Sequence, residues 1–347
     1  MKSPGTLSGP FPWFGGKSRA AGLIWPRFGD VANYVEPFAG SLAVLLARPH
    51  EPRAETVNDI DCYLANFWRA LAANPAEVAR WADYPINEAD LHARHQWLVN
   101  RVEFREQMRA DPEFCDFQIA GWWVWGLCMW IGGGWCTAKA QDDGYENGVH
   151  KWRKRPNLKR GGNGVHRRGL PQQLPMLGGD GSGSGRGIFR WGVDGQLLEW
   201  FELLAQRLRR VRVCCGDWSR VLTKTPTTHI GVTGVMLDPP YGAGAGRDED
   251  IYAHDDLDVA EAVRQWAIEN GPNPQLRIAL CGYEGEHAMP KDWECVAWKA
   301  QGGYGNQSDK SGKTNAGRER IWFSPYCLRP SDEFCFAGGT GDLDLGK

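Results

Sequence analysis

Short apolar runs that end in an acid or a glycine turn alternate with helical spacing at both ends of the chain. A run of this kind predicts a buried strand, and apolar positions three and four residues apart predict an amphipathic helix. The predicted strands are 32–38, a segment ending at 56–59, 211–215, 234–237 and 277–281, with 293–299 and 320–323 as a closing pair. The predicted helices start at 42–47 or span 64–71, 196–208 and 258–269. A strand, a glycine turn, a helix and a second strand ending in an acid form the first half of a dinucleotide-type fold.

The middle of the chain has a different texture. Residues 76–130 are predicted to be helical, with Asn74-Pro75 and Asp111-Pro112 as breaks or helix starts. Tryptophans crowd residues 121–135, and their spacing favours packing in a buried helix over base stacking. From Gly132 the chain is rich in Gly, Asn, Lys and Arg, and the run 178–185 of mainly glycine and serine predicts a loop that holds no packed core.

The two α/β ends therefore flank an insertion. One core made from both ends of the chain explains this order better than two domains in series. We expect an α/β fold, a Rossmann-like sheet with helices on both faces, formed by 1–75 and 210–330. Residues 76–209 are the predicted insertion of helices and loops, and 331–347 a flexible tail.

Length and composition are those of a folded globular protein. The chain has 347 residues, of which 42% are hydrophobic and 24% charged, with no run of 18 apolar residues and no signal-peptide pattern at its start. We therefore expect a cytoplasmic location and no membrane association. None of the ten cysteines forms a Cys-x-x-Cys pair, so buried or half-buried thiols in a reducing compartment fit better than zinc or disulfides, and no metal is expected.

The net charge of −2 hides a segregation. Residues 151–190 contain ten basic side chains and one acid, Asp180, a charge of +9 that leaves about −11 for the rest of the chain. Such a patch attracts a polyanion to one face, although a solvated basic loop has the same composition. The candidate DNA-binding residues share this segment: Lys151, Arg153, Lys154, Arg155, Lys159, Arg160, Arg167 and Arg168.

The strongest chemical signal is an apolar strand that runs into Asp238-Pro239-Pro240-Tyr241. The strand places the acid at the carboxyl end of a sheet, where open α/β folds bind ligands. The two prolines fix the backbone and remove two N–H donors, so that carbonyl groups remain to accept hydrogen bonds. An acid and a fixed carbonyl can together accept both hydrogens of an amino group, and a tyrosine can stack on a base. A plain Pro-Pro turn after a strand is the alternative.

Other motifs accompany this one in a family order, and here the chain resembles the Dam-like (D12) class of DNA adenine-N6 methyltransferases. Trp13-Phe14-Gly15-Gly16-Lys17 resembles that family's N-terminal Trp-x-Gly-Gly-Lys element, which helps to hold the methionine end of the cofactor. Glu36-Pro37-Phe38-Ala39-Gly40 resembles its Phe-x-Gly-x-Gly cofactor loop. Leu42 stands where the family has its second glycine, which would tighten the loop or shift the methionine moiety.

Two further acids complete the resemblance. Asp59 stands where such proteins hold the ribose hydroxyls of the cofactor, and Asp217-Trp218 matches the pair that contacts its adenine. A helix N-cap for the segment starting near Ile60 is the alternative for Asp59, and a turn cap is the alternative for Asp217. The cofactor-binding candidates are Trp13, Gly16, Lys17, Glu36, Pro37, Phe38, Gly40, Asp59, Asp217, Trp218 and Asp238.

The resemblance implies methyl transfer from S-adenosyl-L-methionine to N6 of adenine in double-stranded DNA, with the target base flipped out of the helix. The catalytic candidates are Asp238, Pro239, Pro240 and Tyr241, and 76–209 is the target-recognition region. The loop 302–318, with Lys310, Lys313 and Arg318, either touches DNA or, as we favour, is a solvated hairpin. The alternatives are a cytosine-N4 methyltransferase and a DNA-binding protein with a decayed cofactor site. We expect a monomer, with or without a restriction partner.

Overall fold

The structure is a computed structural model. It describes residues 7–11, 13, 17–85, 87–130, 135–136, 145–146, 149–150, 196–240, 257–298 and 317–330.

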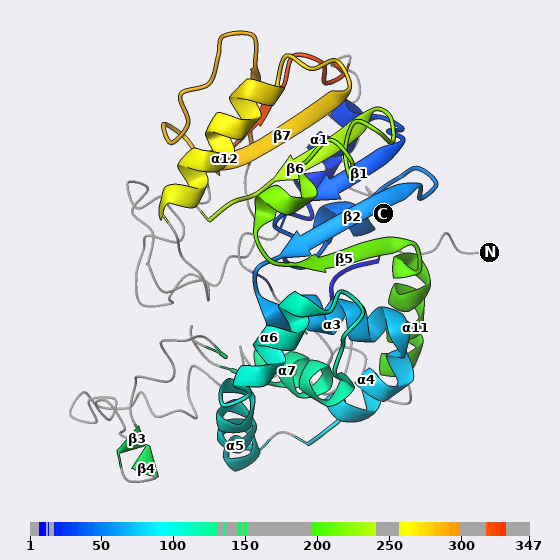
Figure 1. Cartoon of the computed structure of the whole chain (residues 1–347), viewed down its shortest axis with the longest axis vertical. Helices are drawn as coiled ribbons and strands as arrows, with labels where there is room; N and C mark the ends of the chain where they lie inside the picture. The colour runs from blue at the N-terminus through cyan, green and yellow to red at the C-terminus, as the bar shows by residue number, and fades with distance from the viewer. Residues whose placement is uncertain are drawn as a thin grey trace, which may run out of the picture.

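A seven-stranded sheet forms the centre of the fold, with strand order β5-β2-β1-β6-β7-β9-β8 (Figure 1). Its strands are β1 (Asn33–Glu36), β2 (Ala54–Asp59), β5 (Val211–Cys215), β6 (Thr233–Leu237), β7 (Leu276–Tyr283), β8 (Glu294–Ala297) and β9 (Glu319–Phe323). The first five strands in this order are parallel to their neighbours, whereas β9 is antiparallel to both β7 and β8. The predicted α/β class with a Rossmann-like sheet is therefore confirmed, and so is the closing pair of strands.

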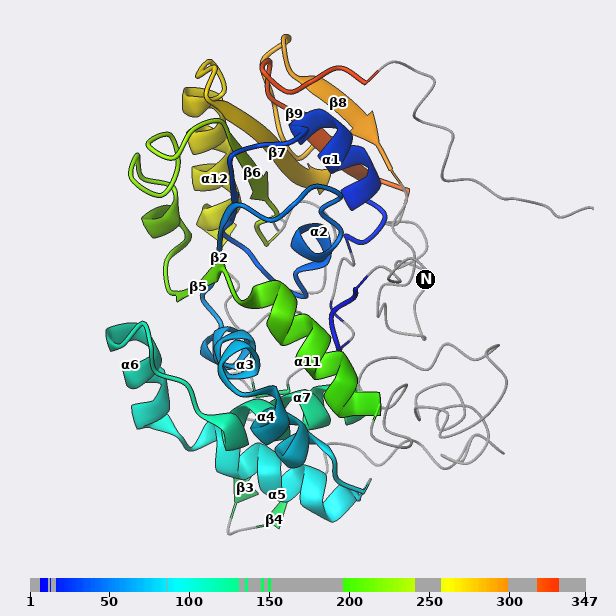
Figure 2. The same cartoon turned by 90° about the vertical axis from the view of Figure 1, so that its right-hand side faces the viewer.

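Helices cover both faces of this sheet, as Figure 2 shows. On one face lies α12 (Leu257–Asn270), whose Val263 packs into a cluster with Val35 and Val235. On the other lie α1 (Ala21–Phe28) and α2 (Ala43–Leu46), against a cluster that includes Tyr34 and Met236. Tyr34 and Val35 belong to opposite clusters because successive strand side chains point to opposite faces.

Beyond the edge strand β5, the remaining long helices form a second layer of structure (Figures 1 and 2). They are α3 (Cys62–Ala73), α4 (Pro75–Ala82), α5 (Glu88–Val99), α6 (Val102–Ala110), α7 (Phe117–Met129) and α11 (Gln196–Leu208). A two-stranded hairpin, β3 (Tyr145–Glu146) and β4 (Val149–His150), is also described. None of the described helices is long and apolar enough to cross a membrane.

The tryptophan-rich segment is a buried helix, as predicted. In α7, Trp123 and Trp125 are 2% and 0% exposed, and each indole is in the core. The Trp125 Nε1 donates to the Tyr84 carbonyl over 3.0 Å, which satisfies the polar atom of a buried ring. The helix ends at Met129, before the predicted limit of Trp135.

The structure identifies the N-cap residues of α3 and α4. Asn74 caps α4 and Pro75 is its first residue, as the sequence pattern indicated. The cap of α3 is Asp61, whose side chain accepts from the N–H groups of Tyr63 and Leu64. The alternative interpretation of Asp59 as that cap is therefore wrong, because the helix starts two residues later than Ile60.

The nine described cysteines are free thiols. Eight are buried or half-buried, as predicted, and Cys295 on the outer strand β8 is exposed.

Candidate active site

Four acids follow the carboxyl ends of neighbouring parallel strands. Glu36 ends β1, Asp59 ends β2, Asp217 lies two residues after the end of β5, and Asp238 follows β6 directly. From β1 the chain runs outward through β2 to β5 and then crosses back to β6 on the other side of β1, so the boundary between β1 and β6 is the topological switch point of the sheet. Open α/β sheets bind ligands at that edge. The sequence-predicted acids therefore share one edge of the fold.

Asp238 lies beside a buried lysine. The Lys17 Nζ is 3.0 Å from Asp238 Oδ1, and the two side chains are 8% and 24% exposed. Pro239 is buried and Pro240 half-buried. Lys17 comes just before α1 and its carbonyl accepts the first helical N–H, from Ala21, so the start of that helix fixes the lysine backbone. The structure thus brings together the first and last motifs of the predicted set.

A second acid, Glu319, also faces this lysine. Its Oε2 is 3.9 Å from Lys17 Nζ, and the ring centroid of Trp298 is 5.4 Å from the same atom. Sequence reasoning missed Glu319, although a signal was present. In β9, Glu319 occupies the same strand face as the buried residues Ile321 and Phe323, and a charged residue in such a pattern marks a special position.

Glu36 is buried and has no cationic partner among the described residues. Its Oε2 accepts from the Tyr34 hydroxyl over 3.0 Å, and it also accepts from the backbone N–H of Leu45. Burial raises the pKa of Glu36 from 4.5 to about 8, and the nearby negative charge of Asp238 adds to the rise while the hydrogen bond from Tyr34 opposes it. Near neutral pH this carboxyl therefore holds a proton.

Asp59 is in a similar state. Its two oxygens accept from the backbone N–H groups of Gly40, over 3.2 Å, and of Asp61, over 3.0 Å. Burial raises the pKa of Asp59 from 3.8 to about 7, with a further contribution from the charge of Asp61. This carboxyl ties the loop after β1 to the loop after β2.

The loop between β1 and α2 contains two residues with positive φ angles, Gly40 and Leu42. Gly40 has φ +46°, and a Cβ there would lie 2.6 Å from Trp13 Nε1, so only glycine lets the indole approach. Leu42 has φ 56° and ψ 25°, the left-handed region, where a glycine would be free of strain. The Leu42 side chain is fully buried, and its burial offsets that strain. The glycine that the family has here is thus replaced without a change to a right-handed backbone.

Asp217 and Trp218 make different kinds of contact: the first caps a short helix and the second packs against an aromatic ring. Asp217 caps the short helix η2 (Trp218–Val221), with its Oδ1 accepting from the Ser219 N–H over 2.9 Å, so the turn-cap interpretation describes its contacts here. Trp218 is half-buried and stacks on Phe38, with ring centroids 6.3 Å apart and planes 27° from parallel. Two aromatic rings from the β1 and β5 loops therefore lie beside the acids.

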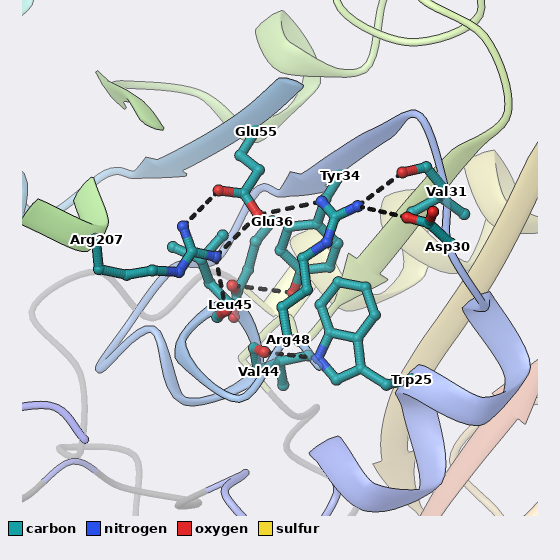
Figure 3. Close-up of polar contacts among 10 residues, drawn as sticks. All are labelled: Trp25, Asp30, Val31, Tyr34, Glu36, Val44, Leu45, Arg48, Glu55 and Arg207. Atoms are coloured by element: carbon teal, nitrogen blue, oxygen red, sulfur yellow. Dashed lines mark hydrogen bonds and ion pairs between the residues drawn. The ribbon is translucent and has the colours of Figure 1, made fainter. Parts of the chain in front are cut away.

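A buried ion-pair network anchors α2, the helix that follows this loop (Figure 3). Glu55 on β2 accepts from Arg48 over 3.1 Å and from Arg207 on α11 over 2.6 and 2.9 Å. Arg207 also donates to the Leu45 carbonyl, and Trp25 donates to the Val44 carbonyl, so two carbonyls near the end of α2 are satisfied by side chains. The cofactor-loop candidate therefore rests on a rigid support.

Several predicted residues lie outside the described part of the chain. They are Gly16, Tyr241, Lys310, Lys313 and the eight basic candidates Lys151, Arg153, Lys154, Arg155, Lys159, Arg160, Arg167 and Arg168. Arg318 is described, and its guanidinium lies 5.4 Å from the ring centroid of Tyr283.

Comparison with known proteins bears on the same motifs. Residues 13–120 match the family model of D12 class N6 adenine-specific DNA methyltransferases. No curated protein matches the chain. The matched range contains Lys17, Glu36 and Asp59, while Asp217 and Asp238 lie beyond it. The resemblance seen in the motifs is confirmed over residues 13–120, and the Rossmann-like sheet agrees with that family.

Proposed function

We propose that this chain transfers a methyl group from S-adenosyl-L-methionine to N6 of an adenine that has been flipped out of double-stranded DNA. The observation that carries the proposal is the arrangement of Glu36, Asp59 and Asp238 at one switch point of the sheet, with Lys17 against Asp238.

The residues at that edge fit the cofactor. Glu36 and Asp59 are desolvated carboxyls with raised pKa values, and none of the described lysines or arginines forms an ion pair with them. In our proposal a cationic ligand supplies the missing charge, and Asp59 accepts from the ribose hydroxyls of the cofactor. Phe38 and Trp218 offer aromatic surface beside Asp217 for an adenine ring. Bound S-adenosylmethionine supplies a methyl group activated by its sulfonium charge.

The catalytic difficulty is the target amine, whose lone pair is delocalised into the adenine ring. In our proposal Asp238 and the Pro239 carbonyl each accept one N6 hydrogen, which favours a nitrogen whose lone pair points at the methyl group. The Asp238 carboxylate also stabilises the positive charge that develops on N6. Correct positioning contributes up to about 7–11 kcal/mol in well-oriented systems. Tyr241 stacks on the flipped base.

In this proposal the chain is divided between a catalytic domain and an insertion that recognises DNA. Residues 1–75 and 210–330 form the methyltransferase domain, 76–209 the target-recognition insertion and 331–347 a tail. All seven strands of the sheet lie in 33–59 and 211–323, and α4 to α7 lie between those ranges, which supports the division. The basic residues of 151–168 neutralise phosphates, and an arginine among them is suited to read a guanine edge.

The decisive experiment supplies tritiated cofactor and DNA of mixed sequence, followed by nucleoside analysis. We expect label in N6-methyladenine. Label only in N4-methylcytosine would replace adenine with the cytosine alternative. Retained DNA affinity without any label would favour a decayed cofactor site, for which the Leu42 backbone is the motivating observation.

DNA binding has its own test. Replacing Lys154, Arg155 and Lys159 together with Gln should weaken DNA binding and reduce the salt slope by about 2–3, since each phosphate contact contributes roughly 0.9. The matched control removes the same charge at three arginines that pair with acids at the surface, Arg53, Arg80 and Arg264. Equal effects of both triple variants would make segment 151–168 an ordinary surface loop.

A further inference from the structure

The ammonium of Lys17 is held by groups from two separate parts of the sheet. Asp238 follows the parallel strand β6, and Glu319 opens the antiparallel strand β9, two positions away in the sheet. Lys17 Nζ lies 3.0 Å from the first carboxylate and 3.9 Å from the second. The Glu319 side chain is only 5% exposed.

Because Glu319 is buried, the pairing of its carboxyl group with Lys17 matters for its stability. A buried carboxylate charge costs several kcal/mol unless it is paired, so a buried acid either has a cationic partner or, like Glu36, has a raised pKa. The backbone of Glu319 is fixed on both sides, since it pairs with Tyr283 of β7 and its carbonyl accepts from the Trp298 N–H over 3.2 Å. The acid is therefore presented to Lys17 from a rigid position.

A lysine needs such a second anchor if it is to orient another group. Its ammonium is a point charge on a flexible four-carbon stem, and a single carboxylate partner leaves several rotamers open. Glu319, 3.9 Å away, and the ring of Trp298, whose centroid is 5.4 Å away, add two further contacts to the short one with Asp238 and so restrict the ammonium.

We propose that Glu319 is a positioning residue for methyl transfer: it holds the Lys17 ammonium, and Lys17 in turn fixes the orientation of the Asp238 carboxylate. The inference rests on the proposed function, because Asp238 is the residue that would accept the N6 hydrogen. Glu319 itself touches neither substrate nor cofactor in this scheme.

A purely structural role is the competing explanation, and a nearby ion pair provides the matched control. Glu294 on β8, the neighbour of β9, pairs with Arg27 over 2.7 Å and is not part of the site. Loss of Glu294 measures what a lost ion pair in this part of the sheet costs by itself.

The kinetic test compares E319Q, E319D and E294Q, together with E319Q in a K17M background. E319Q should lower kcat by about 10- to 100-fold, the range expected when a reacting group is misplaced, while KM for DNA stays nearly constant. E319D keeps the charge and should recover part of the loss, and E294Q should keep the wild-type kcat. In the K17M background E319Q should add nothing, because Glu319 acts through Lys17. A wild-type kcat in E319Q, or losses that multiply in the double variant, would overturn the inference.

A second measurement needs no turnover. Brief reductive methylation with formaldehyde, followed by peptide mass spectrometry, reports how accessible the Lys17 amine is. Its labelling should rise several-fold in E319Q relative to wild type and stay unchanged in E294Q and E319D. Unchanged labelling in E319Q would contradict the anchoring role even if the proposed methylation were absent, so failure of the inference and failure of the function are distinguishable.

Discussion

Glu36 and Glu55 lie on neighbouring strands and are both buried, but the chain surrounds them differently (Figure 3). Glu55 is paired with two arginines, Arg48 and Arg207. Glu36 accepts from a tyrosine hydroxyl and a backbone N–H, and its raised pKa shows the cost of that environment. We infer that the chain supplies cations where an acid supports the fold. It leaves out the cation where a positively charged ligand is to bind.

Asp238 has a cationic partner, Lys17, like Glu55, but lies at the candidate active site like Glu36. Its replacement should have the largest effect on activity. The variant Asp238→Ala should lose methyl transfer by about 10²- to 10³-fold or more, because the developing charge on N6 loses its partner. Binding of the cofactor, measured by calorimetry, should survive. Loss of both binding and turnover would assign Asp238 to the fold or to the cofactor instead.

Removing the charge of Glu55 should damage stability rather than chemistry. The variant Glu55→Gln leaves Arg207 without its carboxylate partner and Arg48 with only the partly exposed Asp30, at a cost of up to roughly 3–5 kcal/mol in the free energy of unfolding. Urea denaturation measures this loss. The matched variant Glu77→Gln removes an exposed i,i+3 partner of Arg80 and should leave the stability nearly unchanged, because solvent screens that pair. Equal losses in the two variants would remove the distinction between buried and exposed pairs.

The pH dependence of stability should separate Glu36 from Glu55. Because the pKa of Glu36 rises from 4.5 to about 8 on folding, the folded chain retains a proton that the unfolded chain releases between those values. The stability that this proton provides is complete below pH 4.5 and is lost as the pH rises toward 8. Asp59 contributes in the same direction between 3.8 and about 7.

The variant Glu36→Gln should therefore flatten the stability profile of the ligand-free protein and exceed wild type in stability near pH 8. Urea midpoints at several pH values test this. Parallel profiles for variant and wild type would show that Glu36 ionises as an ordinary glutamate.

The sequence predicts the elements of this fold well where local patterns determine them. Helix α11 was expected at the residues where it lies, since its apolar spacing is regular, and β5 likewise. Asp59 remained an alternative cap for α3 because Asp59 and Asp61 are equally good caps in sequence, and only the start of the helix selects Asp61. Element boundaries depend on such tertiary choices.

The site was only partly predictable, for a different reason. Motifs located Lys17 and Asp238, yet their contact depends on how α1 packs on the sheet, which no local pattern encodes. Glu319 belongs to no motif and matters only because β9 inserts between β7 and β8. The raised pKa values of Glu36 and Asp59 follow from burial, which a sequence does not reveal residue by residue.

The central claim is that Glu36 and Asp59 lack a cationic partner because a positively charged ligand supplies it. The most direct test is to measure by calorimetry, between pH 6 and 8.5, the binding of S-adenosylmethionine and of S-adenosylhomocysteine, whose sulfur is uncharged. If Glu36 and Asp59 ionise to meet a positive ligand, affinity for S-adenosylmethionine should rise with pH by at most about tenfold per unit for each carboxyl, with release of protons. S-adenosylhomocysteine, which lacks the sulfonium charge, should show a weaker dependence, and Glu36→Gln should reduce the difference between the two ligands. An identical pH dependence for both ligands would contradict the account.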